Sequence, residues 1–337
     1  MEVNRIEMKN YNIIFNIRLI IIGVILICMV LSGCSSKPKK YQVGILSGLE
    51  IFETTIDGFK GKMAESGYIE GKNIIYDVQK TGFDIAIYQG ILKKFVNDKV
   101  DLIFVFPTEA ALEAKTITNG TGIPVIFANA FTEDTSLVNN IKEPGGNITG
   151  VRWVGKDIAL QRFEILQEMI PEVKRIIIMY QRYYPIVKSQ LEALRPVAAK
   201  AGITLIEIPA LDPQDLESQL KKMSVNRGTD AILGIAEPLL GQAWNIIDNF
   251  AKKNKLPIGA GIISEEGGNT IFNLTPQNIP QGNQAAFLTI KVFNGAQVGT
   301  LPVLSAENYF IINYKAVQKL GLRISDSLLN QANEIIR

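Results

Sequence analysis

The stretch that decides the fold is Asp101-Leu102-Ile103-Phe104-Val105-Phe106, which is apolar at every position after the first. A short run of this kind is typical of a strand that is buried on both faces of a parallel sheet. The same pattern returns at Asp230-Ala231-Ile232-Leu233-Gly234-Ile235. A second apolar run that contains a proline follows each copy at a similar distance, at residues 123–127 and 256–260. The chain therefore repeats one structural unit.

Outward from these runs, short apolar segments alternate with amphipathic segments from residue 41 onward. Expected strands lie at residues 42–46, 73–78, 102–106, 124–128, 175–180, 204–208, 230–235 and 256–260. Expected helices lie at residues 54–66, 85–97, 110–118, 187–201, 216–224 and 281–293. This order is typical of β-α units that feed parallel sheets, and about 300 residues exceed one typical core. The sequence predicts an α/β protein with two doubly wound, parallel-sheet lobes and a ligand cleft between them.

Two Gly-Gly-Asn segments indicate where the chain passes from one lobe to the other. The first is Pro144-Gly145-Gly146-Asn147-Ile148-Thr149-Gly150-Val151, and the second, at residues 267–269, precedes an apolar run. Turn formers beside β-branched residues are typical of a crossover segment. We expect a first lobe of residues 41–150 plus about 275–305, and a second of 151–274 plus about 306–337. A third crossing would then lie near residues 301–310.

The beginning of the chain has the order of a cleaved export signal. Basic residues precede an apolar run at residues 19–30, which ends in Leu31-Ser32-Gly33-Cys34. This run is shorter than the roughly 20 residues that a membrane-spanning helix needs. The four residues resemble the lipobox of bacterial lipoproteins. We expect a signal peptide at residues 1–33, with Met1 or Met8 as the start.

Cys34 would then become the lipidated first residue of the mature chain, followed by a tether over residues 34–40. Several lipid chains on one cysteine hold a protein at a membrane surface, because each buried methylene contributes roughly 0.8 kcal/mol. The expected location is extracytoplasmic, with the chain lipid-anchored to the bacterial cell membrane.

Composition limits the chemistry of the folded part. After residue 33 the chain has 32 basic and 31 acidic residues, and it has no histidine. No clustered basic surface is expected, so we expect no nucleic-acid partner. The two cysteines are Cys28, within the signal, and Cys34. Catalysis by Ser-His-Asp or Cys-His groups and a cysteine zinc site are therefore excluded, so an enzyme would have to work with carboxylates, Lys or Tyr. We expect a binding protein with no cofactor and no metal rather than an enzyme.

Several segments together carry a resemblance to a known family. They are Gly58-Phe59, Gly67-Tyr68-Ile69-Glu70-Gly71-Lys72-Asn73, Phe95-Val96, Val100-Asp101-Leu102-Ile103, Ile123-Pro124-Val125-Ile126-Phe127, the first crossing segment, and Tyr314 with residues 316–322. Over residues 41–337 the chain resembles substrate-binding lipoproteins of ABC transporters, in the branch that includes tryptophan and tyrosine binders. These resemble type I periplasmic binding proteins, whose two lobes close like a hinge over a small solute. The resemblance implies a membrane permease and an ATPase as partners, and a monomeric chain.

The expected site lies on the loops that follow the strands, because ligands of open α/β sheets bind beyond the carboxyl ends of the strands. The candidate ligand-binding residues on these loops are Ser47, Thr108, Glu109, Phe131, Arg152, Trp153, Gln181, Tyr183 and Glu237.

Aromatic candidates suit stacking on a ring or closing over an apolar group. Trp153, Phe131, Tyr183 and the neighbouring Tyr184 are of this kind. Each of them would equally fit ordinary core or lobe-interface packing.

The charged candidates also have both a ligand-binding role and a structural alternative. Glu237 and Glu109 would pair with an ammonium group, or each would cap the helix that follows it. Arg152 would clamp a carboxylate or lie as a solvated surface charge. Ser47 and Thr108 would offer hydroxyls beside helix N-termini, where an anionic group is favoured.

The chain departs from the resembled family on these loops. Ser47-Gly48-Leu49-Glu50-Ile51-Phe52 replaces a polar or histidine-containing run, and Phe131-Thr132 lies where Asp-Pro is common. Tyr180-Gln181-Arg182-Tyr183-Tyr184-Pro185 replaces a small polar loop, and Ala236-Glu237-Pro238 replaces Thr-Asp-Asn. The family's ligand therefore cannot be carried over directly. We predict capture of a small amino-acid-like solute, aromatic or not, for an importer. A ligand sensor that signals to a membrane receptor and an extracytoplasmic enzyme stay as alternatives.

Overall fold

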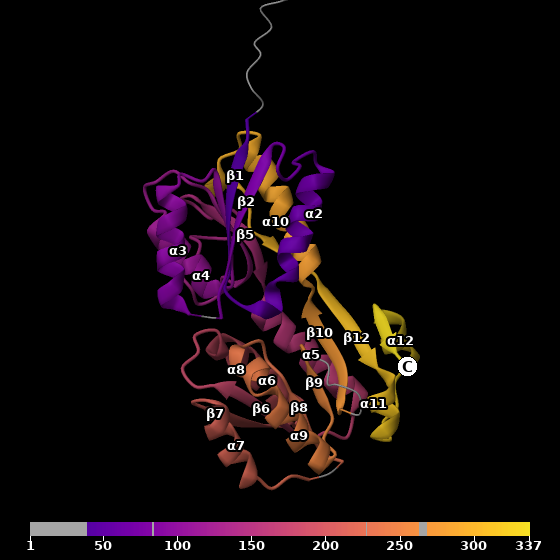
Figure 1. The fold of residues 1–337 in the computed structure, drawn as a ribbon. Helices are drawn as coiled ribbons and strands as arrows, with labels where there is room; N and C mark the ends of the chain where they lie inside the picture. The colour runs from indigo at the N-terminus through magenta and orange to yellow at the C-terminus, as the bar shows by residue number, and fades with distance from the viewer. Residues whose placement is uncertain (1–38, 83, 227, 263–267) are drawn as a thin grey trace, which may run out of the picture. The chain divides into compact units, whose positions relative to one another are not determined.

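The computed structural model describes residues 39–82, 84–226, 228–262 and 268–337. The expected signal peptide, Cys34 and most of the tether lie outside these residues. Within the described part, no helix combines the length and the apolar character needed to cross a membrane. Residues Tyr41–Arg337 form one unit, which is built around two sheets (Figure 1).

The first sheet has six strands in the order β11-β5-β4-β3-β1-β2, and every neighbouring pair is parallel. Its strands are β1 (Tyr41–Ser47), β2 (Ile74–Lys80), β3 (Leu102–Phe106), β4 (Val125–Phe131), β5 (Ile148–Trp153) and β11 (Leu304–Ser305). The helices that belong with it are η1 (Glu50–Phe52), α2 (Thr54–Glu65), α3 (Ile85–Asn97), α4 (Thr108–Ile117), α10 (Asn278–Phe293) and η2 (Val298–Thr300).

Strand β3 shows why its sequence is apolar throughout. Ile103 and Val105 pack in a cluster with residues of α3 and α4. Leu102, Phe104 and Phe106 pack in another cluster with residues of α2 and α10. Successive side chains of a strand point to opposite faces, and here both faces are covered by helices. No polar side chain lies within β3 itself, and the polar residues Asp101 and Thr108 lie just outside its two ends.

The second sheet has seven strands in the order β13-β12-β10-β9-β8-β6-β7. Its strands are β6 (Arg175–Gln181), β7 (Thr204–Ala210), β8 (Asp230–Leu233), β9 (Ile258–Ala260), β10 (Thr270–Pro276), β12 (Asn308–Asn313) and β13 (Glu334–Ile336). Its helices are α5 (Gly155–Met169), α6 (Val187–Lys200), α7 (Pro213–Lys221), α8 (Pro238–Gln242), α9 (Trp244–Asn254), α11 (Tyr314–Lys319) and α12 (Asp326–Gln331). All neighbouring pairs are parallel except β10 and β12, which are antiparallel.

Helix α10 returns to the first sheet after β10 of the second and packs against α2 (Figure 1). The two helices approach so closely that glycine is required on both. A Cβ at Gly282 would lie 2.1 Å from the carbonyl oxygen of Thr55, and one at Gly58 would lie 2.2 Å from that of Ile279. This close packing places the start of α10 beside the ends of the first-sheet strands.

The limits of some elements differ from those that the sequence indicates. Strand β5 continues to Trp153 because Ala130 and Phe131 of β4 pair with residues 152 and 153, whereas the sequence places a crossing at residue 150. Helix α7 begins at Pro213, since the side chain of Asp212 accepts a hydrogen bond from the N–H of Asp215 and caps the helix. The antiparallel strand β12 is also unexpected from a pattern of β-α units.

Candidate functional site

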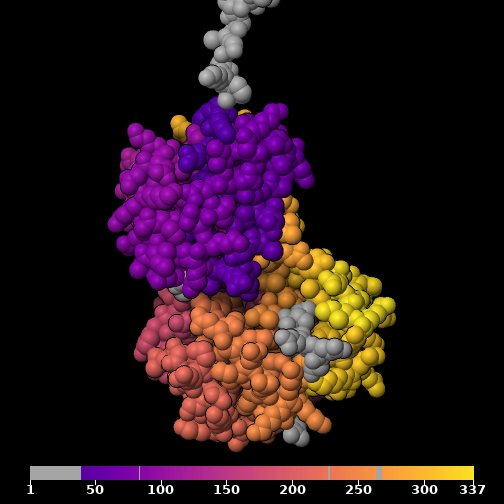
Figure 2. All heavy atoms as spheres, in the orientation of Figure 1, coloured from indigo at the N-terminus to yellow at the C-terminus, as the bar shows by residue number. Residues whose placement is uncertain are grey.

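A cavity of about 830 Å³ opens at the carboxyl ends of the strands of both sheets. The first lobe, which is mostly indigo to purple, and the second lobe, which runs from magenta through orange to yellow, meet along a visible boundary (Figure 2). Residues that line the cavity include Leu49, Phe52, Thr108, Glu109, Asn129, Phe131, Trp153, Arg162, Tyr184, Ile235, Glu237, Gly261, Asn273, Thr275, Ile279 and Tyr309. Both lobes contribute to the wall, and most of its side chains are apolar or aromatic, as in ordinary small-molecule sites.

Five of the nine residues that the sequence proposes for the site line this cavity: Thr108, Glu109, Phe131, Trp153 and Glu237. The other four, Ser47, Arg152, Gln181 and Tyr183, do not belong to its lining. Arg152 and Trp153 are adjacent on β5, and only Trp153 lines the cavity, so at this strand end the direction of the side chain makes the difference.

Trp153, at the end of β5, is held in a defined orientation. Its Nε1 donates a hydrogen bond of 2.7 Å to Oε1 of Gln281, a buried residue of α10. Its ring makes edge contacts with Phe52, at a centroid distance of 5.8 Å, and with Phe131, at 5.7 Å. These contacts form an aromatic corner in the wall that the first lobe provides.

Phe131 also fulfils the packing alternative. It is 8% exposed and clusters with Ile186 and Ala236, which belong to the second lobe. Trp153 and Tyr184 pack against this cluster. Part of the aromatic corner therefore forms apolar contacts between the lobes.

Glu237 caps helix α8, which is one of the two roles that its position suggests. Its carboxylate accepts hydrogen bonds from the backbone N–H groups of Leu240 (2.6 Å), Leu239 (2.9 Å) and Gln181 (3.0 Å). Burial nevertheless raises the pKa of Glu237 to about 7, because the three hydrogen bonds only partly offset the loss of water. Gln181 thus acts on the site through its backbone, while its side chain stays outside the lining.

Glu109 meets a tyrosine from the other lobe. Tyr184 Oη donates a hydrogen bond of 2.8 Å to Glu109 Oε1. Burial, and then the charge of Glu109, raises the pKa of Tyr184, so the phenol stays protonated and remains a donor.

Tyr183 is not placed as the sequence suggests. Its side chain is 86% exposed, and its backbone has a left-handed conformation with a φ of 69°. This conformation turns the chain sharply after β6, so Tyr184 takes the inward position instead of Tyr183.

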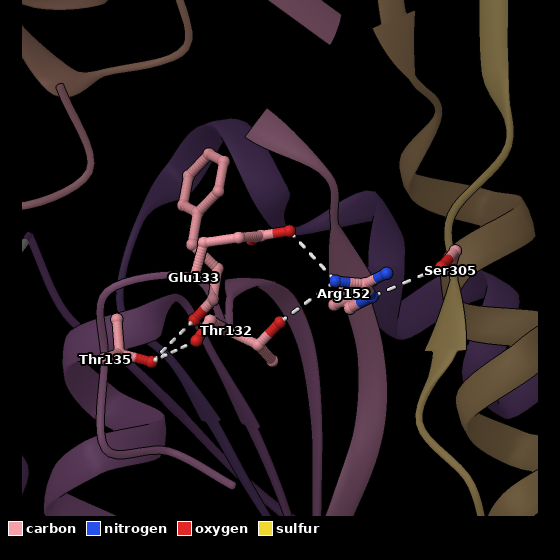
Figure 3. A network of polar contacts seen from close by, with 6 residues as sticks. Thr132, Glu133, Thr135, Arg152 and Ser305 are labelled. Atoms are coloured by element: carbon pink, nitrogen blue, oxygen red, sulfur yellow. Dashed lines mark hydrogen bonds and ion pairs between the residues drawn. The ribbon is translucent and has the colours of Figure 1, made fainter. Parts of the chain in front are cut away.

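Arg152 makes its side-chain contacts with residues that do not line the cavity (Figure 3). Its Nη1 lies 2.9 Å from Glu133 Oε1 and 3.4 Å from Thr132 Oγ1, and its Nε lies 3.3 Å from Ser305 Oγ. The pairing with Glu133 neutralises the guanidinium locally. A carboxylate clamp at Arg152 inside the cleft is therefore not what the structure shows.

The side chains of Ser47 and Thr108 differ in whether they reach the cavity. Ser47 is 1% exposed, and its hydroxyl donates a hydrogen bond of 3.4 Å to the carbonyl oxygen of Leu49. Thr108 lines the cavity, and its Oγ1 accepts a hydrogen bond of 3.0 Å from the N–H of Phe131. Of these two residues, only Thr108 belongs to the cavity lining.

Three buried polar residues of the lining are not among the nine candidates: Asn129, Arg162 and Asn273. Asn129 and Asn273 each have a buried Oδ1 with no hydrogen-bond partner in the described part of the chain. Arg162 lies on the apolar face of α5 and is 1% exposed. A charged residue within a helical apolar face is the one sequence signal that points to it.

Among the residues that the structure describes, no three His, Cys, Asp or Glu side chains gather as a metal site would require. The recognition groups of the cavity are thus a buried arginine, two carboxylates, two amides and an aromatic corner. This combination suits a small solute with charged ends and an apolar body.

A family model described as "ABC transporter substrate binding protein" matches residues 45–336. The chain belongs to the ABC transporter substrate-binding protein family. The family and the two-lobed fold expected from the sequence are confirmed. This substrate-binding protein has a small molecule as ligand and an ABC permease and ATPase as partners. Its family and its relatives are extracytoplasmic solute-binding proteins rather than enzymes.

Relatives of this substrate-binding protein include the tyrosine-binding protein of Clostridioides difficile (strain R20291). It is 29% identical over 328 residues, which cover 90% of this chain and 92% of the relative. A solved structure of an ABC domain from Streptococcus pneumonia, in complex with L-Trp, has a TM-score of 0.75 at 24% identity, with 88% of this chain and 100% of that chain covered. The structure of a conserved domain protein from Vibrio cholerae has a TM-score of 0.74 at 26% identity, with coverages of 89% and 100%.

Proposed function

We propose that this protein is the lipid-anchored, extracytoplasmic substrate-binding component of an ABC importer, and that it captures an amino-acid-like solute by hinge closure. The observation that carries the proposal is the cavity, whose wall combines an aromatic corner from one lobe with acidic and polar groups from both. Its volume of about 830 Å³ lies in the usual range for small-molecule sites.

A solute with a ring or a large apolar side chain fits the cavity best. Trp153 and Phe131 offer faces and edges for an aromatic or apolar body. Glu237 and Glu109 offer negative charge to an ammonium group. The relative named as a tyrosine-binding protein and the structure with bound L-Trp support this class of solute.

The way in which both lobes share the lining supports hinge closure. The chain passes between the sheets after β5, after β10 and after β11, so only short segments join the lobes. A solute that touches both lobes gains all of its contacts only when they are close together. Such a difference in affinity between the two arrangements is what drives closure.

Lipid anchoring is supported by the sequence at Leu31-Ser32-Gly33-Cys34. A lipidated Cys34 would keep the binding unit close to the permease at the membrane surface. The tether over residues 34–40 would give the unit freedom to meet the permease.

Isothermal titration calorimetry of the purified full chain with each of the twenty amino acids tests the proposal. We expect saturable binding of L-tyrosine, L-tryptophan or another amino acid with a large apolar side chain. Uptake of the bound amino acid by cells should also require the ABC permease that is the partner of this protein. Binding of none of the twenty would contradict the proposed solute class.

A further inference from the structure

The cavity contains a buried cation that no acidic group of the described chain neutralises. Arg162 lies on α5, lines the cavity and is 1% exposed. Its Nε and Nη2 donate to the carbonyl oxygen of Leu274, at 2.9 and 2.7 Å, and its Nη1 donates to that of Gly234, at 2.7 Å. Burial alone lowers the pKa of Arg162 to about 9, so the group is still positively charged at neutral pH.

The absence of a side chain at Gly261 leaves space for the Arg162 guanidinium at the cavity. A Cβ at Gly261 would lie 2.3 Å from Arg162 Nη2, and Gly261 is itself part of the lining. The three printed hydrogen bonds use three of the five N–H groups of an arginine side chain, and the described residues supply no acceptor for the other two. Two donors of a buried cation thus remain for a group that enters the cavity.

A purely structural role does not account for the charge. Neutral donors would satisfy the carbonyl oxygens of Leu274 and Gly234, whereas a guanidinium without a carboxylate partner carries a large desolvation cost. A carboxylate brought by the solute would remove that cost, since arginine and carboxylate match in shape and charge.

A buried acceptor lies on β10, one residue before the carbonyl group that Arg162 binds. Asn273, which precedes Leu274, is 8% exposed, lines the cavity and has an unpartnered buried Oδ1. An ammonium group has three hydrogen-bond donors. Asn273 Oδ1 can accept one of these hydrogen bonds, and a carboxylate of the cavity lining can accept another.

We propose that Arg162 binds the carboxylate of the solute at the part of the cavity wall that the second lobe provides. Asn273 Oδ1 then accepts a hydrogen bond from the adjoining ammonium group. The proposal rests on the proposed function, because it assigns one end of an amino-acid-like solute to particular atoms. It places the carboxylate on a residue of α5 instead of on Arg152, Ser47 or Thr108. Arg162 would thereby select α-amino acids over the corresponding amines.

Calorimetry with matched pairs of solutes tests this assignment. The pairs are L-tyrosine with tyramine and L-tryptophan with tryptamine, which differ only in the carboxylate. We expect the wild type to bind the amino acid of a pair at least about 30-fold more tightly than the amine, because loss of one partner of a buried charge pair has effects of this size. In Arg162→Gln the affinity for the amino acid should fall by a similar factor, while the affinity for the amine should not fall.

Arg195→Gln is the matched control, since Arg195 is half exposed and pairs with Glu207, and neither residue lines the cavity. It should leave both affinities unchanged. If Arg162→Gln does not fold, the ratio of amino acid to amine in the wild type still decides, and Arg162→Lys, which keeps the charge, should retain part of that ratio.

Each result has one meaning. Equal binding of amino acid and amine by the wild type, or an equal loss of both in Arg162→Gln, overturns the role of Arg162 and leaves the proposed function intact. Binding of neither L-tyrosine nor L-tryptophan, with other amino acids also inactive, overturns the proposed function, and the carboxylate site fails with it.

Discussion

Tyr184 Oη donates a 2.8 Å hydrogen bond to Glu109 Oε1, and this bond joins the two lobes at the wall of the cavity. Tyr184 follows β6 of the second sheet, and Glu109 lies in the first turn of α4 beside the first sheet. A hydrogen bond to a charged acceptor is stronger than one between neutral groups. It therefore favours the arrangement in which the lobes are close.

Replacing Tyr184 with phenylalanine should weaken solute binding. The change Tyr184→Phe removes only the hydroxyl, so the contacts of the ring stay while the bond to Glu109 is lost. A hydrogen bond to a charged group contributes about 1.5–3 kcal/mol, which corresponds to a loss of affinity of about 10-fold or more in calorimetry. Tyr183→Phe is the control, because Tyr183 is 86% exposed. A larger effect at Tyr183 than at Tyr184 would contradict this placement.

The two groups proposed to contact the solute should differ in their effects. Glu237→Gln should weaken binding by about 2–5 kcal/mol if its charge meets an ammonium group. Trp153→Phe should cost on the order of 0.5–1.5 kcal/mol beyond the lost contact area. The second tryptophan, Trp244, does not line the cavity, so Trp244→Phe serves as a control. Wild-type affinity in both site variants would show that these side chains do not touch the solute.

Glu237 should make stability depend on pH. Its pKa is raised from 4.5 to about 7 in the folded chain, so between these values the folded chain binds more protons than the unfolded chain. The free energy of unfolding should therefore decrease as the pH rises from about 4.5 to about 7, by on the order of 1–3 kcal/mol. Below this range the carboxyl is protonated in both states, and the penalty is absent.

Glu237→Gln should remove that part of the slope, because the amide does not ionise. Urea unfolding at several pH values from 4 to 8 measures it. Wild type and variant are expected to diverge within the range from 4.5 to 7 and to run parallel above it. Parallel curves over the whole range would show that the carboxyl titrates normally.

The contact between α2 and α10 should not tolerate a methyl group. Gly282→Ala would place a Cβ 2.1 Å from the carbonyl oxygen of Thr55, so the helices must separate. Overpacking of this kind typically costs about 1–3 kcal/mol, which urea unfolding would detect. Gly90→Ala is the control, since a Cβ there meets no atom within 4 Å and lies inside α3. It should instead stabilise the protein by about 0.5–1 kcal/mol.

Membrane attachment should depend on Cys34. Cys34→Ala removes the proposed lipid carrier, so the protein should appear in the soluble fraction or keep an uncut signal. Cys28→Ala, in the same signal, should change neither property. Fractionation with mass spectrometry of the product measures both. Unchanged membrane association and mature mass in Cys34→Ala would contradict the lipoprotein assignment.

Local patterns in the sequence determined the architecture of this protein. The fully apolar run at residues 102–106 can only be satisfied when both of its faces are covered, and its repetition at 230–235 predicts a second sheet of the same kind. The loops after the strands could also be located, because ligand sites follow the carboxyl ends of parallel strands. These inferences need only the order of residues along the chain.

The direction of individual side chains was decided by the tertiary structure. One left-handed residue after β6 sends Tyr183 outward and Tyr184 inward, and no periodicity reveals such a turn. Trp153 takes its orientation from Gln281, which the chain supplies only after passing through the second sheet. Arg162 becomes part of the cavity because the ends of β8 and β10 present carbonyl oxygens to it. Such contacts join residues far apart in sequence, so they exist only once both sheets have formed and their helices have packed.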